Sequence, residues 1–578
     1  MDYKAIYEEW LNGSVFDDKT KEELKAISGD EKEIQERFYK ELEFGTAGLR
    51  GIIGAGTNRM NVYTVRKATQ GLANYINSRD KKDASVVIAF DSRRMSPEFA
   101  EESALCLAAN GIKAYVFESL RPTPELSYAV RKLGCIAGIN ITASHNPPEY
   151  NGYKVYWEDG AQITPPHDKG IMDEVKAITD YTTLKTMTKD EAISAGKYEV
   201  IGKEVDDEYI KELKKLVIHQ DSIDAVCNDI SIVYTPLHGT GNIPVRRILD
   251  ELGFKNVYVV KEQELPDGEF PTVSYPNPEA EEAFELALKL AKEKDADLVL
   301  ATDPDADRLG VYVKDSKTGE YITLTGNMSG CLIGDYEISQ IKETKGLPAD
   351  GALIKTIVST DMANAIAKYY GIQLIEVLTG FKFIGQQILQ FETEGKGTYL
   401  FGFEESYGCL VGTHARDKDA VVATMKLCEA AAYYKTKNMT LWDAMLAMYE
   451  RYGYYKDDVK AITLSGKEGL EKIQLIMDTL RNNVPKEMGG YTIKTVRDYQ
   501  TGEICNLEDG SKTETGLPKS NVLYYELGEG VWFCVRPSGT EPKIKFYYGV
   551  VGNSLDDANN KSAEFAKSIL EFIDNITR

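Results

Sequence analysis

The sequence predicts an α/β protein of several domains that ends in a domain of α+β character. Its 578 residues exceed what one hydrophobic core can organise, and roughly 150 residues per domain suggests three to five domains. Short apolar runs alternate with helical patterns along most of the chain, which is typical of βα units around a mostly parallel sheet. Near the end, two apolar strands at 522–527 and 531–535 lie close enough to form a hairpin.

Four domains are predicted from these patterns, with the spans 1–204, 205–320, 321–453 and 454–578. In the first domain, strand 86–90 leads into Asp91-Ser92-Arg93-Arg94. Ser96 and Pro97 then predict a helix cap and a first-turn proline, and a second strand follows at 136–141.

The later domains continue the pattern. Strands are predicted at 230–234, 297–301, 352–358 and 544–550. Between the first two of these, a helix carries one apolar stripe of Phe284, Ala287, Leu288 and Ala291. The final helix buries one face made of Phe565, Ile569, Phe572, Ile573 and Ile576.

Composition and charge argue against several functional classes. The net charge of −23 argues against nucleic acid or an anionic membrane as partner, so an anionic small molecule would need local basic residues. The eight cysteines form no CxxC pair and read as reduced core residues. The charged N-terminus does not resemble a signal peptide, and no segment is apolar enough to span a bilayer, so we expect a cytoplasmic enzyme.

The first loop that carries candidate catalytic residues is Thr142-Ala143-Ser144-His145-Asn146-Pro147-Pro148. An apolar strand delivers Ser144 into a turn that two prolines end, and the carboxyl ends of strands are where open α/β sheets bind ligands. Taken alone, an ordinary Ser-Asn-Pro turn explains these residues as well.

The second loop is Asp303-Pro304-Asp305-Ala306-Asp307-Arg308. Three carboxylates at i, i+2 and i+4 repel each other unless a cation neutralises them, and oxygen ligands suit a hard ion such as Mg²⁺. An EF-hand would need a glycine at the sixth position and a glutamate at the twelfth, where this chain has Arg308 and Lys314. The alternative is a solvated acidic turn, which the buried character of the preceding strand disfavours.

Two further loops complete the set. Residues 402–408 read Gly-Phe-Glu-Glu-Ser-Tyr-Gly and can hydrogen-bond the hydroxyls of a sugar. Residues 536–542 read Arg-Pro-Ser-Gly-Thr-Glu-Pro and offer a guanidinium fork and a backbone nest to a phosphate. In isolation, each is also explained as an ordinary surface turn.

Together the four loops, in this order, resemble the α-D-phosphohexomutase superfamily over nearly the whole chain. The opening segment 44–51, Phe-Gly-Thr-Ala-Gly-Leu-Arg-Gly, is similar to the branch of bacterial phosphoglucomutases and phosphoglucomutase/phosphopentomutase enzymes. The resemblance implies three α/β domains with mixed sheets and a C-terminal α+β domain around a central cleft. It also implies interconversion of glucose 1-phosphate and glucose 6-phosphate through a phosphoserine, a glucose 1,6-bisphosphate intermediate and Mg²⁺.

The resemblance also implies residue roles. The catalytic set is Ser144, Lys154 as a general base, His145 and Arg50. The metal set is Asp303, Asp305 and Asp307 with an oxygen on Ser144. The substrate-binding set is Arg308, Thr379, Gly380, Glu404, Ser406, His414 and Lys418. The set that holds the phosphate not being transferred is Arg536, Ser538, Gly539 and Thr540.

The sugar loop departs from the commoner glucose-type pattern, because Phe403 stands where glycine is usual and Tyr407 near where phenylalanine is usual. A pentose 1-phosphate therefore remains an alternative substrate. A phosphate-ester hydrolase is a further alternative, although it gives no reason for the loop at Arg536. A silent sugar-phosphate sensor would need neither Ser144 nor the three aspartates.

Overall fold

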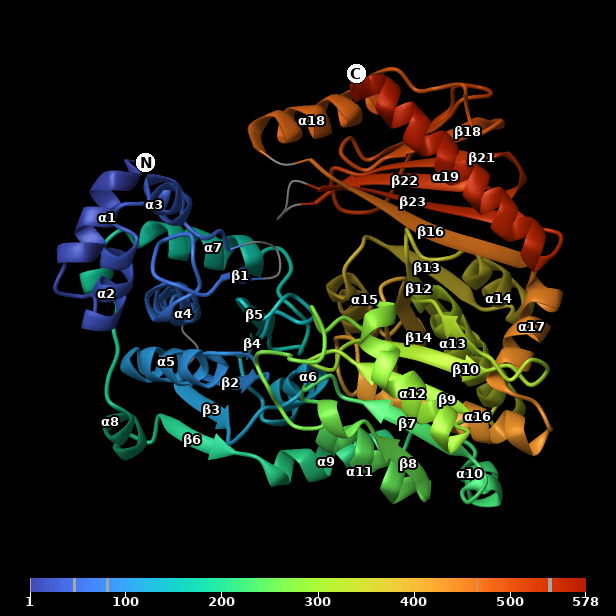
Figure 1. The fold of residues 1–578 in the computed structure, drawn as a ribbon, viewed down its shortest axis with the longest axis horizontal. Coiled ribbons are helices and arrows are strands. Elements are labelled where there is room, and N and C mark those ends of the chain that lie inside the picture. Colours follow the sequence, from blue (N-terminus) through green and yellow to red (C-terminus); the bar gives the residue numbers. More distant parts are fainter. Residues whose placement is uncertain (1, 45–47, 80–82, 465, 539–542, 578) are drawn as a thin grey trace. The chain divides into compact units, whose positions relative to one another are not determined.

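The computed structural model describes residues 2–44, 48–79, 83–464, 466–538 and 543–577, and the chain packs into two compact units (Figure 1). Unit 1 comprises Met1–Gly326, Phe381–Lys396 and Ser406–Leu441. Unit 2 comprises Asn327–Gly380, Gly397–Glu405 and Trp442–Arg578.

Unit 1 opens with three short helices, α1 (Tyr3–Asn12), α2 (Asp18–Ala26) and α3 (Glu31–Phe38). Aspartates cap all three N-termini through their side chains, which satisfies backbone N–H groups that the helices leave unpaired. The helices bury Trp10, Phe16 and Phe38 against Tyr63 of the adjoining domain. This cap therefore has its own small aromatic core.

The first sheet of unit 1 is mixed and has the strand order β1-β5-β4-β2-β3-β6. Its strands are β1 (Leu49–Ile52), β2 (Ser85–Phe90), β3 (Lys113–Phe117), β4 (Ala137–Ile141), β5 (Tyr150–Trp157) and β6 (Tyr198–Ile201). β2 pairs in parallel with β3 and β4, whereas β5 runs antiparallel to β4 and β1. Its helices are α4 (Val62–Asn77), α5 (Ser96–Ala109), α6 (Thr123–Lys132), α7 (His167–Ala177) and α8 (Lys189–Ser194). The predicted strands 86–90 and 136–141 are confirmed.

The predicted cap of α5 is wrong. The N-cap is Met95, and Ser96 is the first helical residue. Its hydroxyl donates instead to Asp91 Oδ1 at 2.8 Å. A buried carboxylate that follows the neighbouring strand competes with the helix end for this hydroxyl.

The second sheet of unit 1 has the order β11-β10-β9-β7-β8. Its strands are β7 (Ser231–Thr235), β8 (Asn256–Val259), β9 (Leu298–Thr302), β10 (Leu309–Lys314) and β11 (Tyr321–Leu324). Because β11 pairs with β10, this sheet extends to residue 324. Its helices are α9 (Lys203–Lys214), α10 (Gln220–Val226), α11 (Asn242–Leu252) and α12 (Glu285–Lys294). Unit 1 also holds α15 (Phe381–Glu394), β15 (Gly408–Val411) and α16 (Ala420–Thr436).

Unit 2 contains parallel strands and an antiparallel sheet. β12 (Gly351–Thr356) pairs in parallel with β13 (Gln373–Val377) and β14 (Thr398–Glu404). The accompanying helices are α13 (Gly326–Thr344), α14 (Met362–Tyr370) and α17 (Leu441–Tyr452). The strand predicted at 352–358 is confirmed, although it ends two residues earlier.

The antiparallel sheet of unit 2 has the order β16-β23-β22-β21-β18-β19-β20. Its strands are β16 (Tyr454–Thr463), β18 (Tyr491–Asp498), β19 (Glu503–Asn506), β20 (Lys512–Glu514), β21 (Leu523–Leu527), β22 (Trp532–Pro537) and β23 (Lys543–Gly552), and the short β17 (Glu487–Met488) pairs with β18. β21 and β22 form the predicted hairpin. Helices α18 (Gly466–Asn482) and α19 (Leu555–Thr577) contribute Ile476, Phe565 and Ile569 to its core, so the α+β prediction is confirmed.

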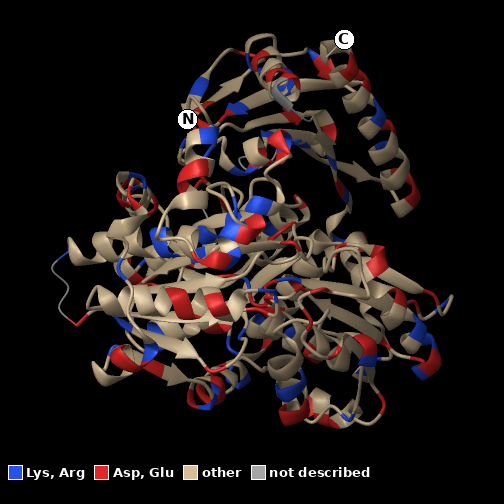
Figure 2. Cartoon of the chain, turned by 60° about the vertical axis from the view of Figure 1, so that its left-hand side comes forward, with Lys and Arg blue, Asp and Glu red and all other residues tan. Residues whose placement is uncertain are grey.

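Charged residues of both signs are interspersed along the helices and strands (Figure 2). Among the helices of the described ranges, none combines the length and apolarity that crossing a bilayer requires.

Candidate active site

Ser144 lies in a buried turn at the carboxyl end of β4. Its side chain hydroxyl donates to Asp303 Oδ2 at 2.6 Å, and its backbone N–H donates to Thr142 Oγ1 at 2.8 Å. Its φ of +50° is in the left-handed region, which is uncommon for a residue with a side chain. Only 3% of Ser144 is exposed. The turn therefore fixes a nucleophilic oxygen directly against a carboxylate of the acidic loop.

His145 and Arg50 lie at the same turn. His145 Nδ1 is 3.1 Å from Ser144 Oγ, and Arg50 Nη1 donates to Asn146 Oδ1 at 3.0 Å. Burial, with the nearby charges of Arg308 and Arg50, lowers the pKa of His145 well below its ordinary value. A neutral imidazole therefore faces the serine oxygen at neutral pH.

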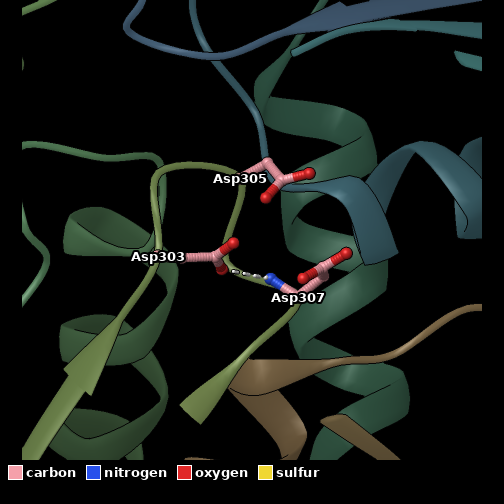
Figure 3. A group of neighbouring side chains, drawn as sticks. All are labelled: Asp303, Asp305 and Asp307. Carbon is pink, nitrogen blue, oxygen red and sulfur yellow. Dashed lines mark hydrogen bonds between the residues drawn. The ribbon is translucent and has the colours of Figure 1, made fainter. Parts of the chain in front are cut away.

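The acidic loop follows β9, and its three carboxylates gather around a common space (Figure 3). One oxygen from each lies within 4.8 Å of the others. Asp303 Oδ1 accepts the backbone N–H groups of Asp307 at 3.1 Å and Arg308 at 3.0 Å. Burial and the charges of the other two carboxylates raise the pKa of Asp303 well above its ordinary value. The alternative of a solvated acidic turn is therefore wrong, because all three aspartates are buried.

Two lysines reach the other carboxylates. Lys154 Nζ lies 2.9 Å from Asp305 Oδ2 and 3.8 Å from Asp307 Oδ2. Lys418 Nζ lies 3.1 Å from Asp307 Oδ2. Burial alone would raise the pKa of Asp305, but the charge of Lys154 and the hydrogen bonds from Asp303, Lys154 and Thr123 together outweigh burial and lower the pKa below the ordinary value.

The acidic loop fits a divalent cation. Among the described residues, no hydrogen-bond donor meets Asp305 Oδ1 or Asp307 Oδ1, although both atoms are buried. Unpaired buried carboxylate oxygens are costly unless a cation binds them. An all-oxygen set of this kind matches the preference of Mg²⁺.

The remaining predicted substrate-binding residues of unit 1 do not all lie at the acidic loop. Arg308 pairs with Glu279 and lies 3.8 Å from Asp307 Oδ1. His414 Nε2 lies 2.7 Å from Asp419 Oδ2, in a separate buried network. Ser406 lies in the partly buried turn before β15. Arg308, which ends the acidic loop, and Lys418 thus lie beside Asp307, whereas His414 contacts Asp419.

The sugar and phosphate residues of unit 2 form their own groups. Glu404 ends β14, is buried, and accepts the backbone N–H of Gly380 at 2.9 Å, beside Thr379. Arg536 lies near the end of β22 opposite Lys545, and the backbone N–H of Ser538 donates to Lys543 O at 2.7 Å. Gly539 and Thr540 lie outside the described residues, as do residues 45–47 of the opening motif.

Two residues that touch this site, Arg93 and Thr123, have no role predicted from the sequence. Arg93 donates to the backbone of the serine turn, including Ser144 O at 2.6 Å. Thr123 Oγ1 donates to Asp305 Oδ2 at 2.7 Å. Arg93 follows strand β2, and Thr123 is the first residue of helix α6. Each is a polar residue between apolar runs, and that pattern in the sequence could have identified it as a candidate.

Three family models match the chain, all described as phosphoglucomutase/phosphomannomutase alpha/beta/alpha domains. Domain I matches residues 41–182, domain II residues 207–319 and domain III residues 325–452. The chain therefore belongs to this family, within the α-D-phosphohexomutase superfamily. It is accordingly an enzyme of the mutase class, an intramolecular phosphotransferase.

Similar proteins indicate which members of the mutase class this chain resembles. The chain is 38% identical over 556 residues to a phosphoglucomutase of Staphylococcus saprophyticus, covering 96% of this chain and 97% of the relative. It is likewise 38% identical over 540 residues to a phosphoglucomutase of Staphylococcus aureus, covering 93% of this chain and 95% of the relative. Among solved structures, parafusin (a phosphoglucomutase) from Paramecium has the same fold, with a TM-score of 0.69 at 20% identity, and the match covers 93% of this chain and 95% of that one.

Proposed function

We propose that this chain interconverts glucose 1-phosphate and glucose 6-phosphate, with Ser144 as the phosphoryl carrier. The observation that carries the proposal is the contact between Ser144 Oγ and the acidic loop at Asp303. The similarity to phosphoglucomutases over most of the chain supports glucose as the sugar.

The chemistry requires two phosphoryl transfers. In the first, a hydroxyl oxygen of the sugar phosphate attacks the phosphorus on Ser144, the bond from phosphorus to Ser144 Oγ breaks, and a glucose 1,6-bisphosphate forms. After the bisphosphate turns around, Ser144 Oγ attacks its other phosphoryl group and releases the isomer. A covalent carrier thus divides the isomerisation into two steps.

The residues around Ser144 suit these transfers. Asp303, Asp305 and Asp307 would hold Mg²⁺, which supplies positive charge to the phosphoryl oxygens. Lys154 is our candidate acceptor for the proton of the attacking hydroxyl, and Arg50 adds positive charge beside the serine turn. Arg50 and the bound cation would also supply the local positive field that a chain of net charge −23 otherwise lacks.

We assign substrate positioning to the residues of the other loops. Glu404 and Ser406 would accept hydrogen bonds from sugar hydroxyls, with Thr379, Gly380, Arg308, His414 and Lys418 completing the substrate-binding set. Arg536, Ser538, Gly539 and Thr540 would hold the phosphate that is not transferred. A contact far from the reacting oxygen still speeds the reaction, because it fixes where that oxygen lies.

A substrate panel tests the proposal. Glucose 1-phosphate, ribose 1-phosphate and deoxyribose 1-phosphate are incubated with the enzyme and Mg²⁺, with and without the corresponding bisphosphate, and the phosphate position is read by NMR. We expect the highest kcat/KM with glucose 1-phosphate and stimulation by glucose 1,6-bisphosphate. Higher kcat/KM with a pentose would establish the phosphopentomutase alternative, and release of inorganic phosphate without isomerisation would establish a hydrolase.

A further inference from the structure

Arg93 is buried beside the serine turn and donates to four backbone carbonyl groups, three in the turn and one at the start of β5. Its Nη1 donates to Pro147 O at 2.9 Å and Tyr150 O at 3.1 Å. Its Nη2 donates to Ser144 O at 2.6 Å and also to Asn146 O. Only 1% of Arg93 is exposed, so these bonds form away from water. One side chain thus donates to four backbone carbonyl groups, one of which, Pro147 O, also accepts the backbone N–H of Tyr150 at 3.1 Å.

The sheet explains how residues so distant in sequence meet. β2 and β4 are parallel neighbours, with Phe90 opposite Ile141. Their carboxyl ends therefore lie at the same edge, where β2 leads to Arg93 and β4 leads to Ser144. Arg93 and Ser144 are therefore in contact although 51 positions separate them in the sequence.

The guanidinium is itself held from two other sides. Arg93 Nε lies 3.4 Å from Asp91 Oδ2, and Asp91 Oδ1 accepts the backbone N–H of Arg93 at 2.9 Å. The guanidinium carbon lies 5.0 Å from the ring centre of Phe270, which is fully buried and comes from the segment after β8. Burial lowers the pKa of Arg93 to about 10, so the group remains charged at neutral pH.

Ser144 needs such support because its backbone is strained. A left-handed φ of +50° persists in a residue with a Cβ only where surrounding contacts over-determine it. The carbonyl of Ser144 is one of those contacts, and its partner is Arg93. The same conformation directs the hydroxyl to Asp303.

We propose that Arg93 is the positioning residue of the phosphoryl carrier: it holds the backbone of the serine turn so that Ser144 Oγ faces Asp303. This inference rests on the proposed function. Arg93 meets no reacting atom and acts through the turn. Its planar fork is required, because the single nitrogen of lysine cannot reach four carbonyl groups spread over the turn and the start of β5.

The test compares Arg93→Lys with Arg94→Lys, a neighbour whose exposed side chain donates to Pro148 O at 3.2 Å and pairs with Glu269. For each variant, kcat and KM for glucose 1-phosphate and the rate of Ser144 phosphorylation by glucose 1,6-bisphosphate are measured. We expect Arg93→Lys to lower kcat and the phosphorylation rate about 100-fold with KM nearly unchanged, since small misplacements of a reacting group cost that much. Arg94→Lys should match the wild type.

Chemical rescue separates positioning from general stability. Added guanidinium ion, at concentrations that leave the wild type folded and with sodium chloride as control, should restore turnover to Arg93→Ala. Wild-type kinetics in Arg93→Lys, an effect on KM alone, or no rescue of a folded Arg93→Ala would each overturn the inference. If Arg93→Ala does not fold, Arg93→Lys, which keeps the charge opposite Asp91, decides. A wild type that neither isomerises sugar phosphates nor carries a phosphoserine would instead defeat the proposed function.

Discussion

Ser144 Oγ donates a hydrogen bond of 2.6 Å to Asp303 Oδ2, across 159 positions of sequence. The contact joins the carboxyl end of β4 in the first sheet to the carboxyl end of β9 in the second. A nucleophile and a cluster of carboxylates that suits a cation thereby share one buried place, as phosphoryl transfer requires.

Replacing Ser144 by alanine should abolish mutase turnover, because no other atom takes the place of the carrier oxygen. Intact-mass measurement should show one phosphate on the active wild type and none on Ser144→Ala. Ser568→Ala, at a half-buried serine of α19 whose hydroxyl donates to Glu564 O, serves as control and should keep both activity and phosphate. Normal turnover by Ser144→Ala would show that the carrier lies elsewhere.

Thr123→Val should weaken metal binding without replacing a proposed ligand. The hydroxyl of Thr123 donates to Asp305 Oδ2 at 2.7 Å, and hydrogen bonds of this kind orient a ligand for its metal. We expect the affinity for Mg²⁺ or Mn²⁺, measured by calorimetry, to fall roughly 10-fold or more. The control is Thr424→Val, which removes a buried hydroxyl that donates to Ala420 O within α16. Equal metal affinity in both variants would remove Thr123 from the site.

Glu404→Gln should impair sugar handling more than phosphorylation of Ser144. The amide keeps an oxygen that can accept the N–H of Gly380, now 2.9 Å from the carboxylate, but it loses the charge. A charge-assisted hydrogen bond is worth about 1.5–3 kcal/mol, so kcat/KM for glucose 1-phosphate should fall about 10-fold or more. Glu394→Gln, at the exposed end of α15, is the control. An unchanged kcat/KM would place Glu404 outside the substrate site.

Arg536→Lys keeps a positive charge and removes only the planar fork. If Arg536 binds the distal phosphate through two parallel bonds, lysine cannot reproduce them. We expect KM to rise and kcat to fall together, while phosphoserine at Ser144 stays detectable by mass. Arg481→Lys, whose partner is Asp498 at 3.0 Å, should leave both constants near the wild type. Wild-type kinetics in Arg536→Lys on every sugar phosphate would make its loop purely structural.

Asp457 should make unit 2 less stable as pH rises. Burial raises the pKa of Asp457 to about 7 and outweighs the hydrogen bond from Thr360, which lowers it; the charge of Asp361 makes a smaller raising contribution. The folded state therefore keeps a proton that the unfolded state releases near pH 4, and this stabilisation is lost as pH rises through about 7. Asp457→Asn mimics the protonated form, so its melting temperature relative to the wild type should increase from pH 5 to pH 8. Asp574→Asn, an exposed control on α19, should show a constant difference.

The sequence by itself determined the elements and the family. Strands 86–90, 136–141 and 230–234 were readable because buried strands are short continuous apolar runs, which is a local property. The four loops were readable because their chemistry depends on neighbouring residues, such as the three aspartates of 303–307. The position of β11 was not readable, because a four-residue strand shows no preference between two adjoining sheets until it pairs.

The tertiary structure alone decided what holds the site together. Arg93 and Ser144, or Thr123 and Asp305, are separated by 51 and 182 positions, and no periodicity in the chain relates them. Their contact depends on which strands become neighbours and on how far each buried side chain is removed from water. Sheet register made Arg93 the support of the serine turn, and burial made its hydrogen bonds strong enough to hold a strained residue in place.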